Sequence, residues 1–542
     1  MNNAVFNTAI PGNEPIYGYL KGSPERKALE KELERQSSII VDIPAIINGR
    51  EVRTGKTKNV VMPCDHGHVL AKYHQVGPEE VKLAIKAACD AKEEWMTMSW
   101  VERTAITLKA AKLIADKYRD LINASTMLGQ GKNVFQAEID SVGETIDFLR
   151  FNAYFISKIY GEQPLSTPEQ MNRVEFRPLE GFVFTITPFN FTAIGSNLNM
   201  APVLMGNTTI WKPATTSLLS NYYLMQVFKE AGLPDGVINF LPGSGAVISE
   251  VALKSKELAG IHFTGSNNTF NSLWKGVSDN LGTYKSYPKL VGETGGKDFI
   301  FVHNSSDPTQ VAAAFVRGAF EYQGQKCSAC SRGYVPKSLW PEVKDRMQGM
   351  LKRIKLGDVR DFDCFVNAVI DEKSFDSIMG YISKAKSSTS AKIIAGGEGD
   401  KSKGYFVQPT VIETFVPRFV TMEEEIFGPV LTIYVYDDDQ FEETLKICDS
   451  TSPYALTGAI FARDRSAIVT ACQALRYAAG NFYYNDKCSG AMVGLQPFGG
   501  ARASGTNDKA GGVYNLLRWI SPRTIKENYL PPVDFPYPYM EK

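Results

Sequence analysis

The residues around Cys327 are the part of the sequence best suited to covalent chemistry. Cys327 stands in EYQGQKCSACSR (321–332), at the expected end of a helix that begins near Asp307, and Gly324 lies just before it. A thiol placed there can face a cleft instead of a core. Because the thiolate is the nucleophile and a free cysteine is mostly protonated at neutral pH, a reactive thiol needs a partner base or an activating site.

A carboxylate is a better candidate than a histidine for that base. The chain has five histidines, and none lies in a glycine-rich segment of active-site character: His66, His68, His74, His262 and His303. Glu293, in VGETGGKD, follows an apolar strand pattern and precedes a Gly-Gly pair. Two glycines let the backbone come close to a ligand. The pattern therefore disfavours a Cys/His hydrolase and makes Glu293 a candidate base.

Two simpler interpretations of the cysteines and histidines stay open. CSAC is a C-x-x-C pair (Cys327 and Cys330), which binds metal or is redox-active in some proteins, and a free cysteine is often merely buried. A zinc site needs a second ligand pair, and none is spaced for it. CDHGH (64–68) contains ligand types, but a polar turn beside strands is the commoner explanation. We expect no metal.

Composition limits the function classes. The chain has 542 residues, 44% of them hydrophobic and 22% charged, which is ordinary for a globular protein of two or three domains. Lys+Arg and Asp+Glu are equal at 59 each, so no net field attracts nucleic acid or an anionic membrane. No uncharged apolar run reaches the roughly 18 residues of a membrane span. We expect a small-molecule substrate, with neither nucleic acid nor membrane as partner.

The cysteines and the first residues bear on the compartment. Eight cysteines are scattered without the spacing of a disulfide framework, which favours reduced thiols. Residues 1–20 contain no positive region followed by an apolar run and no arginine-rich amphipathic pattern. These features predict a cytoplasmic protein.

Two series of alternating strands and helices account for most of the chain. From Gly181 the strands are GFVFTIT, TTIWKP, GVINFLPG, GIHFTGS and KLVGE. After Gly296 they are DFIFVH, RGYVP, GPVLTIYVY, TGAIFA and GNFYYND, and this second series contains Cys327. Short apolar strands between helices predict parallel, doubly wound sheets, which bind ligands at the carboxyl ends of their strands. We expect a cleft between two such units.

Several glycines and polar residues follow strands of the first series, and they could converge on one crevice: Asn190, Lys212, Gly243–Gly245, Gly265–Ser266 and Glu293. Each also has a plain explanation, since Asn190 suits a turn and Lys212 suits a solvated strand end. GSGAVI (243–248) lacks the third glycine of the dinucleotide fingerprint. FTGS (263–266) opens a helix, whose first N–H groups favour a phosphate, although it is equally a capping turn.

The remaining segments are expected to cover or extend these units. Helical patterns occupy residues 23–35, 77–97, 99–121 and 134–159. Residues 161–180 contain three prolines and end in an alternating pattern, which indicates an arm. Residues 515–528 alternate weakly, and we expect a final strand there that pairs with the arm or with another subunit.

Seven motifs together resemble the aldehyde dehydrogenase family over nearly the whole chain: TPFNF with Asn190, WKPA with Lys212, FTGS (263–266), GETGGK with Glu293, GQKC with Cys327, EEIFGPV (424–430) and PFGG (497–500). Longer segments resemble its 1-pyrroline-5-carboxylate dehydrogenase branch, namely ETGGKDFIFVH, GQKCSACSR and QPFGGARASGTNDKAGG. The resemblance implies a monofunctional enzyme of proline catabolism that oxidises L-glutamate γ-semialdehyde to L-glutamate with NAD. An NAD(P)-dependent dehydrogenase of another semialdehyde and a non-enzymatic dinucleotide-binding protein are the alternatives.

The same resemblance implies the fold and its division. We expect an α/β, aldehyde dehydrogenase-like fold of two doubly wound domains with a small β oligomerisation arm. Residues 1–160 and 181–293 would form the NAD-binding domain, and 294–493 the catalytic domain. Residues 161–180 and 515–542 would form the arm and the C-terminal strand, through which relatives form homodimers or higher homo-oligomers.

The resemblance also implies the roles of the catalytic residues. Cys327 would attack the aldehyde to form a thiohemiacetal and then a thioester, while the Asn190 amide and the Cys327 N–H hold the oxyanion. Glu293 would be the base for the hydrolytic water. The residues expected to bind NAD are Thr187, Lys212, Gly265, Ser266, Glu425 and Phe427. Those expected to bind substrate are Phe191, Ser328, Gly490, Ala491 and Phe498. The chain departs from many relatives in two places: Ala491 replaces a serine of the loop 489–491, and Thr215 replaces a glutamate that contacts the ribose hydroxyls.

Overall fold

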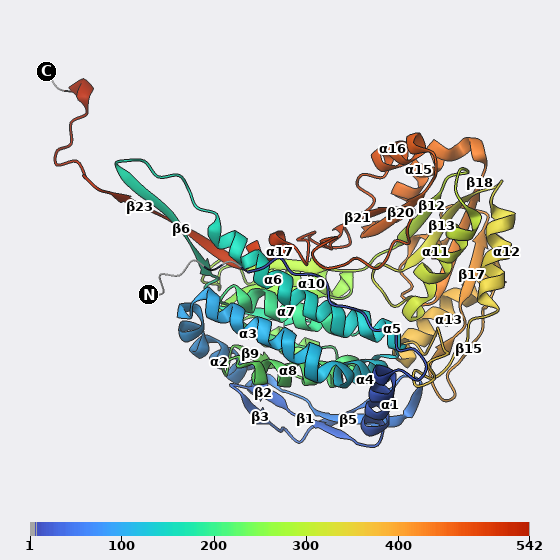
Figure 1. Ribbon diagram of the computed structural model, residues 1–542, viewed down its shortest axis with the longest axis horizontal. Helices are drawn as coiled ribbons and strands as arrows, with labels where there is room; N and C mark the ends of the chain where they lie inside the picture. Colours follow the sequence, from blue (N-terminus) through green and yellow to red (C-terminus); the bar gives the residue numbers. More distant parts are fainter. Residues whose placement is uncertain (1–5, 7, 541–542) are drawn as a thin grey trace.

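The computed structural model describes residue 6 and residues 8–540. Two halves, each built on a seven-stranded sheet, stand side by side, and a long two-stranded ribbon projects from one of them (Figure 1). In the described part of the chain, no helix combines the length and the apolar character needed to cross a membrane.

The first half contains a sheet of strand order β11-β10-β7-β8-β9-β2-β3. The strands expected from the sequence form its parallel centre: β7 (Phe182–Ile186), β8 (Thr208–Lys212), β9 (Ile238–Phe240), β10 (Leu258–Thr264) and β11 (Lys289–Glu293). Two antiparallel strands, β2 (Ala45–Ile47) and β3 (Arg50–Val52), extend it. Strands β7 and β10 are buried along their whole length, because helices cover both faces of a parallel sheet.

The helices of this half lie where the sequence predicts them, except that π-turns at Ile114–Tyr118 and Glu138–Gly143 interrupt two of the expected helices. They are α1 (Pro24–Ser37), α2 (Pro78–Thr97), α3 (Trp100–Leu113), α4 (Arg119–Gln130), α5 (Val134–Ala137), α6 (Glu144–Gly161), α7 (Thr192–Leu204), α8 (Leu218–Ala231), α9 (Gly245–Leu253) and α10 (Asn267–Asp279). The helix expected over 99–121 is longer, because a π-turn at Ile114–Tyr118 joins α3 to α4. Helix α4 ends at Gln130. The next residue, Gly131, caps it with a φ of 69°, the left-handed conformation that favours glycine.

The second half contains a sheet of order β14-β17-β18-β13-β12-β20-β21. Its strands are β12 (Asp298–Val302), β13 (Cys330–Pro336), β14 (Ala391–Ala395), β17 (Thr410–Thr414), β18 (Val430–Tyr436), β20 (Thr457–Phe461) and β21 (Asn481–Tyr484). Helices α11 (Pro308–Phe320), α12 (Trp340–Leu351), α13 (Glu372–Ser387), α15 (Phe441–Ser450) and α16 (Arg465–Ala474) accompany them. No helix or strand was expected from the sequence between α12 and β18, where α13, β14 and β17 lie. Strand β14 is partly exposed and antiparallel to β17, so it lacks the continuous apolar run of a central strand.

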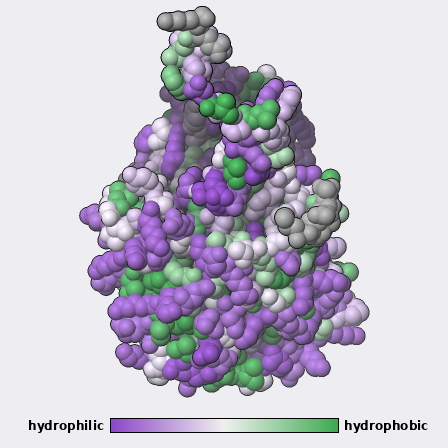
Figure 2. Space-filling view, turned by 90° about the vertical axis from the view of Figure 1, so that its left-hand side faces the viewer, coloured by the Kyte–Doolittle hydropathy of each residue, from purple (hydrophilic) through white to green (hydrophobic). Residues whose placement is uncertain are grey.

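The ribbon consists of β6 (Gln170–Pro178) and β23 (Ile520–Asn528), which pair antiparallel along their whole length (Figure 1). Of the two pairings expected for the final strand, the one with the arm is confirmed. Every residue of β6 is at least partly exposed. Beyond β23, Leu530 and Phe535 are 87% and 80% exposed. Figure 2 views the molecule from the side to which the ribbon points and shows hydrophobic patches among hydrophilic side chains.

Candidate active site

The backbone around Cys327 turns sharply after a capped helix. Asp307 begins α11 by accepting hydrogen bonds from the N–H groups of Thr309 and Gln310, at 2.9 and 3.2 Å. The helix ends at Phe320, and Tyr322 and Gln323 then adopt left-handed φ angles of 50° and 55°. This change of direction brings the partly exposed Cys327 into the turn before β13, at the place that the sequence predicted.

Two cavities meet at Cys327. The strand-end cleft is lined by Cys327 and by the expected residues Thr187, Asn190, Lys212, Gly265, Ser266, Glu425 and Phe427. The inner pocket is lined by Cys327 and by Phe191, Glu293, Ser328, Gly490, Ala491 and Phe498. The structure therefore brings together at Cys327 the residues expected to react and those expected to bind NAD or substrate, whereas Gly243–Gly245, which were also expected to converge there, line neither cavity.

The strand-end cleft lies at the carboxyl ends of neighbouring parallel strands. Lys212 ends β8 opposite Ile186 of β7, and Gly265 follows β10, where its N–H donates to the carbonyl of Glu293 at 3.1 Å. Ser266 caps α10 through its side-chain oxygen. Burial lowers the pKa of Lys212 to about 8, because the interior disfavours the ammonium ion. A ligand that accepts hydrogen bonds from this ammonium would therefore stabilise its charged form.

The Gly-Gly pair after Glu293 makes close contacts within the protein. The Gly296 N–H donates to Glu425 Oε1 at 2.9 Å. A Cβ atom on Gly295 would collide with the Glu425 carboxylate, and one on Gly296 would collide with the Cys327 carbonyl. The two glycines thus allow the loop containing Glu425 and the turn containing Cys327 to approach each other. Gly295 lines the strand-end cleft and Gly296 lines neither cavity, so the expectation that this backbone approaches a ligand stays a prediction.

Asn190 links the two halves of the molecule at the reactive cysteine. Its side chain is 3% exposed, and its Nδ2 donates to the backbone carbonyl of Gln325 at 3.0 Å. A carboxamide nitrogen carries two N–H groups, so one such bond leaves the second N–H for another acceptor. Asn190 is therefore fixed with respect to the chain just before Cys327 and retains a donor.

Burial controls the two groups expected to react. The Glu293 carboxylate accepts from the Gly500 N–H at 3.2 Å, but burial still raises its pKa well above the usual value. Burial, followed by the nearby Asp298, Glu293 and Glu425 carboxylates, also raises the pKa of the Cys327 thiol. The raised pKa disfavours the thiolate, and the expectation that the site activates the thiol stays a prediction. The thiol must give up its proton as it reacts.

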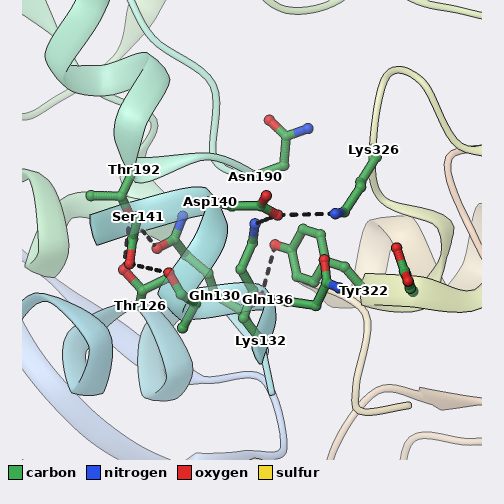
Figure 3. Close-up of polar contacts among 12 residues, drawn as sticks. Thr126, Gln130, Lys132, Gln136, Asp140, Ser141, Asn190, Thr192, Tyr322 and Lys326 are labelled. Carbon is green, nitrogen blue, oxygen red and sulfur yellow. Dashed lines mark hydrogen bonds and ion pairs between the residues drawn. The ribbon is translucent and has the colours of Figure 1, made fainter. Parts of the chain in front are cut away.

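The wall of the inner pocket also contains ionisable residues that the sequence analysis missed: Asp140, Glu144 and Lys326. Asp140 is bound by two buried ammonium groups, Lys132 at 2.6 Å and Lys326 at 3.2 Å (Figure 3). Burial, followed by the Asp140 charge, raises the pKa of Glu144 to about 8. Two features of the sequence could have identified these residues. Lys326 stands directly before Cys327, and Asp140 and Glu144 lie four residues apart in a largely apolar helical segment.

His262 lines the inner pocket, although its sequence segment did not mark it as a residue of the site. It lies on β10, with Nδ1 2.9 Å from the carbonyl of Leu198. Burial lowers its pKa to about 3, so the ring is neutral at physiological pH. Because one ring nitrogen is engaged by a carbonyl and the ring resists protonation, His262 has a packing role against Trp519, at 4.6 Å between ring centroids.

The other candidate ligands for a metal have separate surroundings. The Cys64 thiol lies 3.9 Å from the carbonyl of Gly357, and His66 Nε2 lies 3.1 Å from that of Lys401. Cys330 is buried in the core of the second half. Within residue 6 and residues 8–540, no three His, Cys, Asp or Glu side chains gather as a metal site. The expectation of a metal-free site stays a prediction.

Comparisons with known proteins agree with this geometry. A delta-1-pyrroline-5-carboxylate dehydrogenase, mitochondrial, of Dictyostelium discoideum is 54% identical over 537 residues, covering 98% of this chain and 96% of that protein. The Homo sapiens protein of the same name is 49% identical over 530 residues, covering 98% and 94%. The crystal structure of the Mycobacterium tuberculosis delta-pyrroline-5-carboxylate dehydrogenase bound with NAD is 47% identical, with a TM-score of 0.97 and 100% of both chains covered.

The family model agrees in extent with these relatives. Its match begins in β3 and ends in β23, so it includes the parallel strands of the first sheet, the whole second sheet, the nucleophile turn and most of the ribbon. With the model for the aldehyde dehydrogenase family matching residues 51–525, this chain belongs to that family.

Proposed function

We propose that this protein oxidises L-glutamate γ-semialdehyde, the ring-opened form of 1-pyrroline-5-carboxylate, to L-glutamate with NAD as the hydride acceptor. The observation that carries the proposal is the position of Cys327 on both cavities. A carbon atom bonded to its sulfur would have the strand-end cleft on one side and the inner pocket on the other. The names of the similar proteins support this choice of aldehyde.

The first step is attack of the Cys327 sulfur on the aldehyde carbon. The new C–S bond converts the carbonyl oxygen into an oxyanion, and the proton of the thiol passes to a water molecule and from there to the solvent. The free N–H of the Asn190 amide and the backbone N–H of Cys327 then stabilise the oxyanion. Removing one such donor typically lowers the rate by ~10²–10³-fold.

Glu293 serves the second half of the reaction. Once the aldehyde carbon has lost its hydride, it remains on Cys327 as a thioester. The Glu293 carboxylate takes a proton from a water molecule, which attacks the thioester and displaces the thiolate. The net reaction consumes one water and releases glutamate. The raised pKa of Glu293 makes it a stronger base than an exposed carboxylate.

The strand-end cleft fits NAD by the chemistry of its residues. Among the described residues no carboxylate forms an ion pair with the Lys212 ammonium, whose pKa is lowered by burial, so hydroxyl groups of a ribose suit it. Gly265 and Ser266, at the start of α10, and Thr187 would contact the cofactor backbone, while Glu425 and Phe427 would contact the nicotinamide ribose and ring. When bound, NAD supplies the acceptor for the hydride. Thr215, where relatives have a glutamate, would leave weaker discrimination against NADP.

The inner pocket suits an aldehyde with an acidic end. Phe191 and Phe498 would flank the aliphatic chain. The Ser328 hydroxyl and the backbone N–H groups of Gly490 and Ala491 would hold the α-carboxylate, since N–H and O–H groups directed at a carboxylate make strong hydrogen bonds. Ala491 contributes no hydroxyl, so the loop 489–491 acts through its backbone.

The ribbon supports a homo-oligomer, at least a dimer. A two-stranded ribbon is only marginally stable alone, and a tail with exposed Leu530 and Phe535 favours burial against another surface. We assign residues 1–160 and 181–293 to the NAD-binding domain, 294–493 to the catalytic domain, and 161–180 with 515–542 to the oligomerisation arm and strand. A cytoplasmic location stays a prediction from the sequence.

The test is NADH formation, followed by absorbance, with a panel of aldehydes. We expect kcat/KM for 1-pyrroline-5-carboxylate to exceed that for succinate semialdehyde and hexanal by at least about tenfold, since a missing hydrogen bond to a charged group costs about 1.5–3 kcal/mol. A higher value for succinate semialdehyde would favour the alternative substrate. An absence of NADH with all three would favour the non-enzymatic alternative.

A further inference from the structure

The C-terminal end of α4 supports the turn that contains Cys327. Three successive residues of this end make the contacts. The Tyr322 hydroxyl donates to the carbonyl of Gln130 at 2.9 Å, and Gln323 Nε2 donates to the carbonyl of Gly131 at 2.8 Å. The next residue, Lys132, shares Asp140 with Lys326 (Figure 3). These bonds stabilise the left-handed conformations of Tyr322 and Gln323, which are unfavourable for residues other than glycine.

The side chain of Gln130 supports the segment that contains Asn190. Its Nε2 donates to the carbonyl of Phe189. Its Oε1 accepts from the hydroxyls of Thr192 at 2.9 Å and Ser220 at 3.2 Å (Figure 3). The two bonds to Phe189 and Thr192 are made on either side of Asn190, so they fix the backbone before and after it.

A third contact links the two supported segments. Asn190 Nδ2 donates to the carbonyl of Gln325, two residues before Cys327. Gln130 is therefore bonded by its backbone to the nucleophile turn and by its side chain to the Asn190 segment. It is fully buried and lines neither cavity, so any effect it has on the reaction passes through these neighbours.

We propose that Gln130 is a positioning residue that aligns the Asn190 amide with the nucleophile turn, and so sets the geometry of the oxyanion site. This inference rests on the proposed function. The side chain must donate and accept at the same time, which only a carboxamide can do here: a carboxylate loses the bond to Phe189, and an apolar side chain loses all three. Catalysis is sensitive to such changes, because a displacement of about 1 Å costs roughly 10²-fold in rate.

The test is a double-mutant cycle of Gln130→Leu with Asn190→Ala, measured as kcat for aldehyde oxidation. We expect Gln130→Leu alone to lower kcat by about 10–100-fold with KM for NAD changed by less than about twofold. Asn190→Ala alone should lower kcat by ~10²–10³-fold. In the Asn190→Ala background, Gln130→Leu should add less than about twofold, because a group that acts through the amide has nothing left to align. Multiplicative effects would overturn the proposal.

Companion variants separate alignment from general destabilisation. Gln130→Glu keeps the acceptor oxygen and should lose less activity than Gln130→Leu. Ser125→Ala removes another buried hydroxyl of α4, one bonded only within the helix to Ile122 at 2.9 Å, and should leave kcat within about twofold. A loss in Ser125→Ala equal to that in Gln130→Leu would mean that any polar deletion in α4 acts alike, and would overturn the proposal.

Two further measurements keep the inference testable if Gln130→Leu does not fold or if the substrate is another aldehyde. Thr192→Val removes the hydroxyl donated to Gln130 Oε1 at similar volume and should show the same non-additivity with Asn190→Ala. A crystal structure of Gln130→Glu or Thr192→Val should show Asn190 displaced from the Gln325 carbonyl. An unmoved amide, still about 3.0 Å from that carbonyl, would overturn the alignment role whatever aldehyde is oxidised.

Discussion

The two cavities that meet at Cys327 are built by different means. The strand-end cleft takes its residues from the ends of β7, β8 and β10 and from the loop of Glu425 and Phe427. The inner pocket takes most of its residues from helices α6 and α7, the nucleophile turn and the segment 490–498, and shares with the sheet only side chains of β10 and β11 such as His262 and Glu293. The first follows a rule of parallel sheets, that ligands bind at the carboxyl ends of strands. The second depends on how distant segments pack.

The cavities also differ in their charges. Lys212 in the cleft has its pKa lowered to about 8 by burial alone. In the pocket, Lys326 is paired with Asp140, and Glu144 has its pKa raised to about 8. The cleft therefore offers a cation that a neutral, hydroxyl-rich ligand can satisfy, whereas most charge in the pocket is already paired within the protein. Substitutions should separate the two cavities kinetically.

The largest effect is expected where the cavities meet. Cys327→Ala removes the sulfur that bonds to the aldehyde carbon, and turnover should fall by more than about 10³-fold, since loss of a nucleophile costs up to roughly 10⁶-fold in other enzymes. The Kd for NAD, measured by calorimetry, should stay within about twofold because the cleft keeps its other residues. Substantial remaining turnover would exclude Cys327 as the nucleophile.

The next effect tests the pocket side of the cysteine. Glu293→Gln should still release about one NADH per active site in a rapid burst and then slow by ~10²–10⁴-fold, because thioester hydrolysis lacks its base. Stopped-flow absorbance resolves the two phases. Steady turnover equal to that of the unmodified protein would contradict the assignment.

The pH dependence of the unmodified protein gives the same test without a substitution. Glu293 and Cys327 both act deprotonated, and the pKa of each is raised by burial. The steady rate should therefore rise with pH, and the acid limb of its profile should lie above the usual range of a carboxyl group. A rate that is flat down to about pH 5 would contradict the raised pKa of Glu293.

A smaller effect should be confined to the cleft. Lys212→Met keeps an unbranched side chain one atom shorter and removes the ammonium, and KM for NAD should rise by about tenfold with KM for the aldehyde unchanged, because the lost bond is worth about 1.5–3 kcal/mol. In the unmodified protein, KM for NAD should rise above about pH 8, where Lys212 loses its proton. An equal rise in both KM values would contradict the expectation that Lys212 acts on NAD alone.

The smallest effect should be confined to the pocket. Ala491→Ser introduces a hydroxyl beside the expected carboxylate position, and KM for 1-pyrroline-5-carboxylate should fall by about two- to fivefold, the value of one neutral hydrogen bond. Ala491→Val, which adds bulk without a donor, is the matched control and should raise KM. A change in KM for NAD would show that the loop 489–491 acts on both cavities.

Most of the strands and helices could be predicted without the structure, as could the start of α11 near Asp307 and the positions of Asn190, Lys212, Glu293 and Cys327 at the ends of elements. These follow from local patterns, namely the period of apolar residues, capping side chains and glycines. The motifs, taken together, determined the family. A residue that sits directly after an apolar strand could be placed at the cleft without knowledge of its spatial neighbours.

The wall of the inner pocket and the protein contacts of the Gly-Gly pair could be recognised only in the folded chain. Asp140 and Lys326 are far apart in the sequence, yet they form an ion pair, which no local sequence pattern predicts. The approach of Glu425 to Gly296, the place of His262 and the direction of the pKa shift at Cys327 likewise depend on which segments pack together. Contact and burial are properties of the folded chain, because both depend on neighbours that the sequence separates by tens to hundreds of residues.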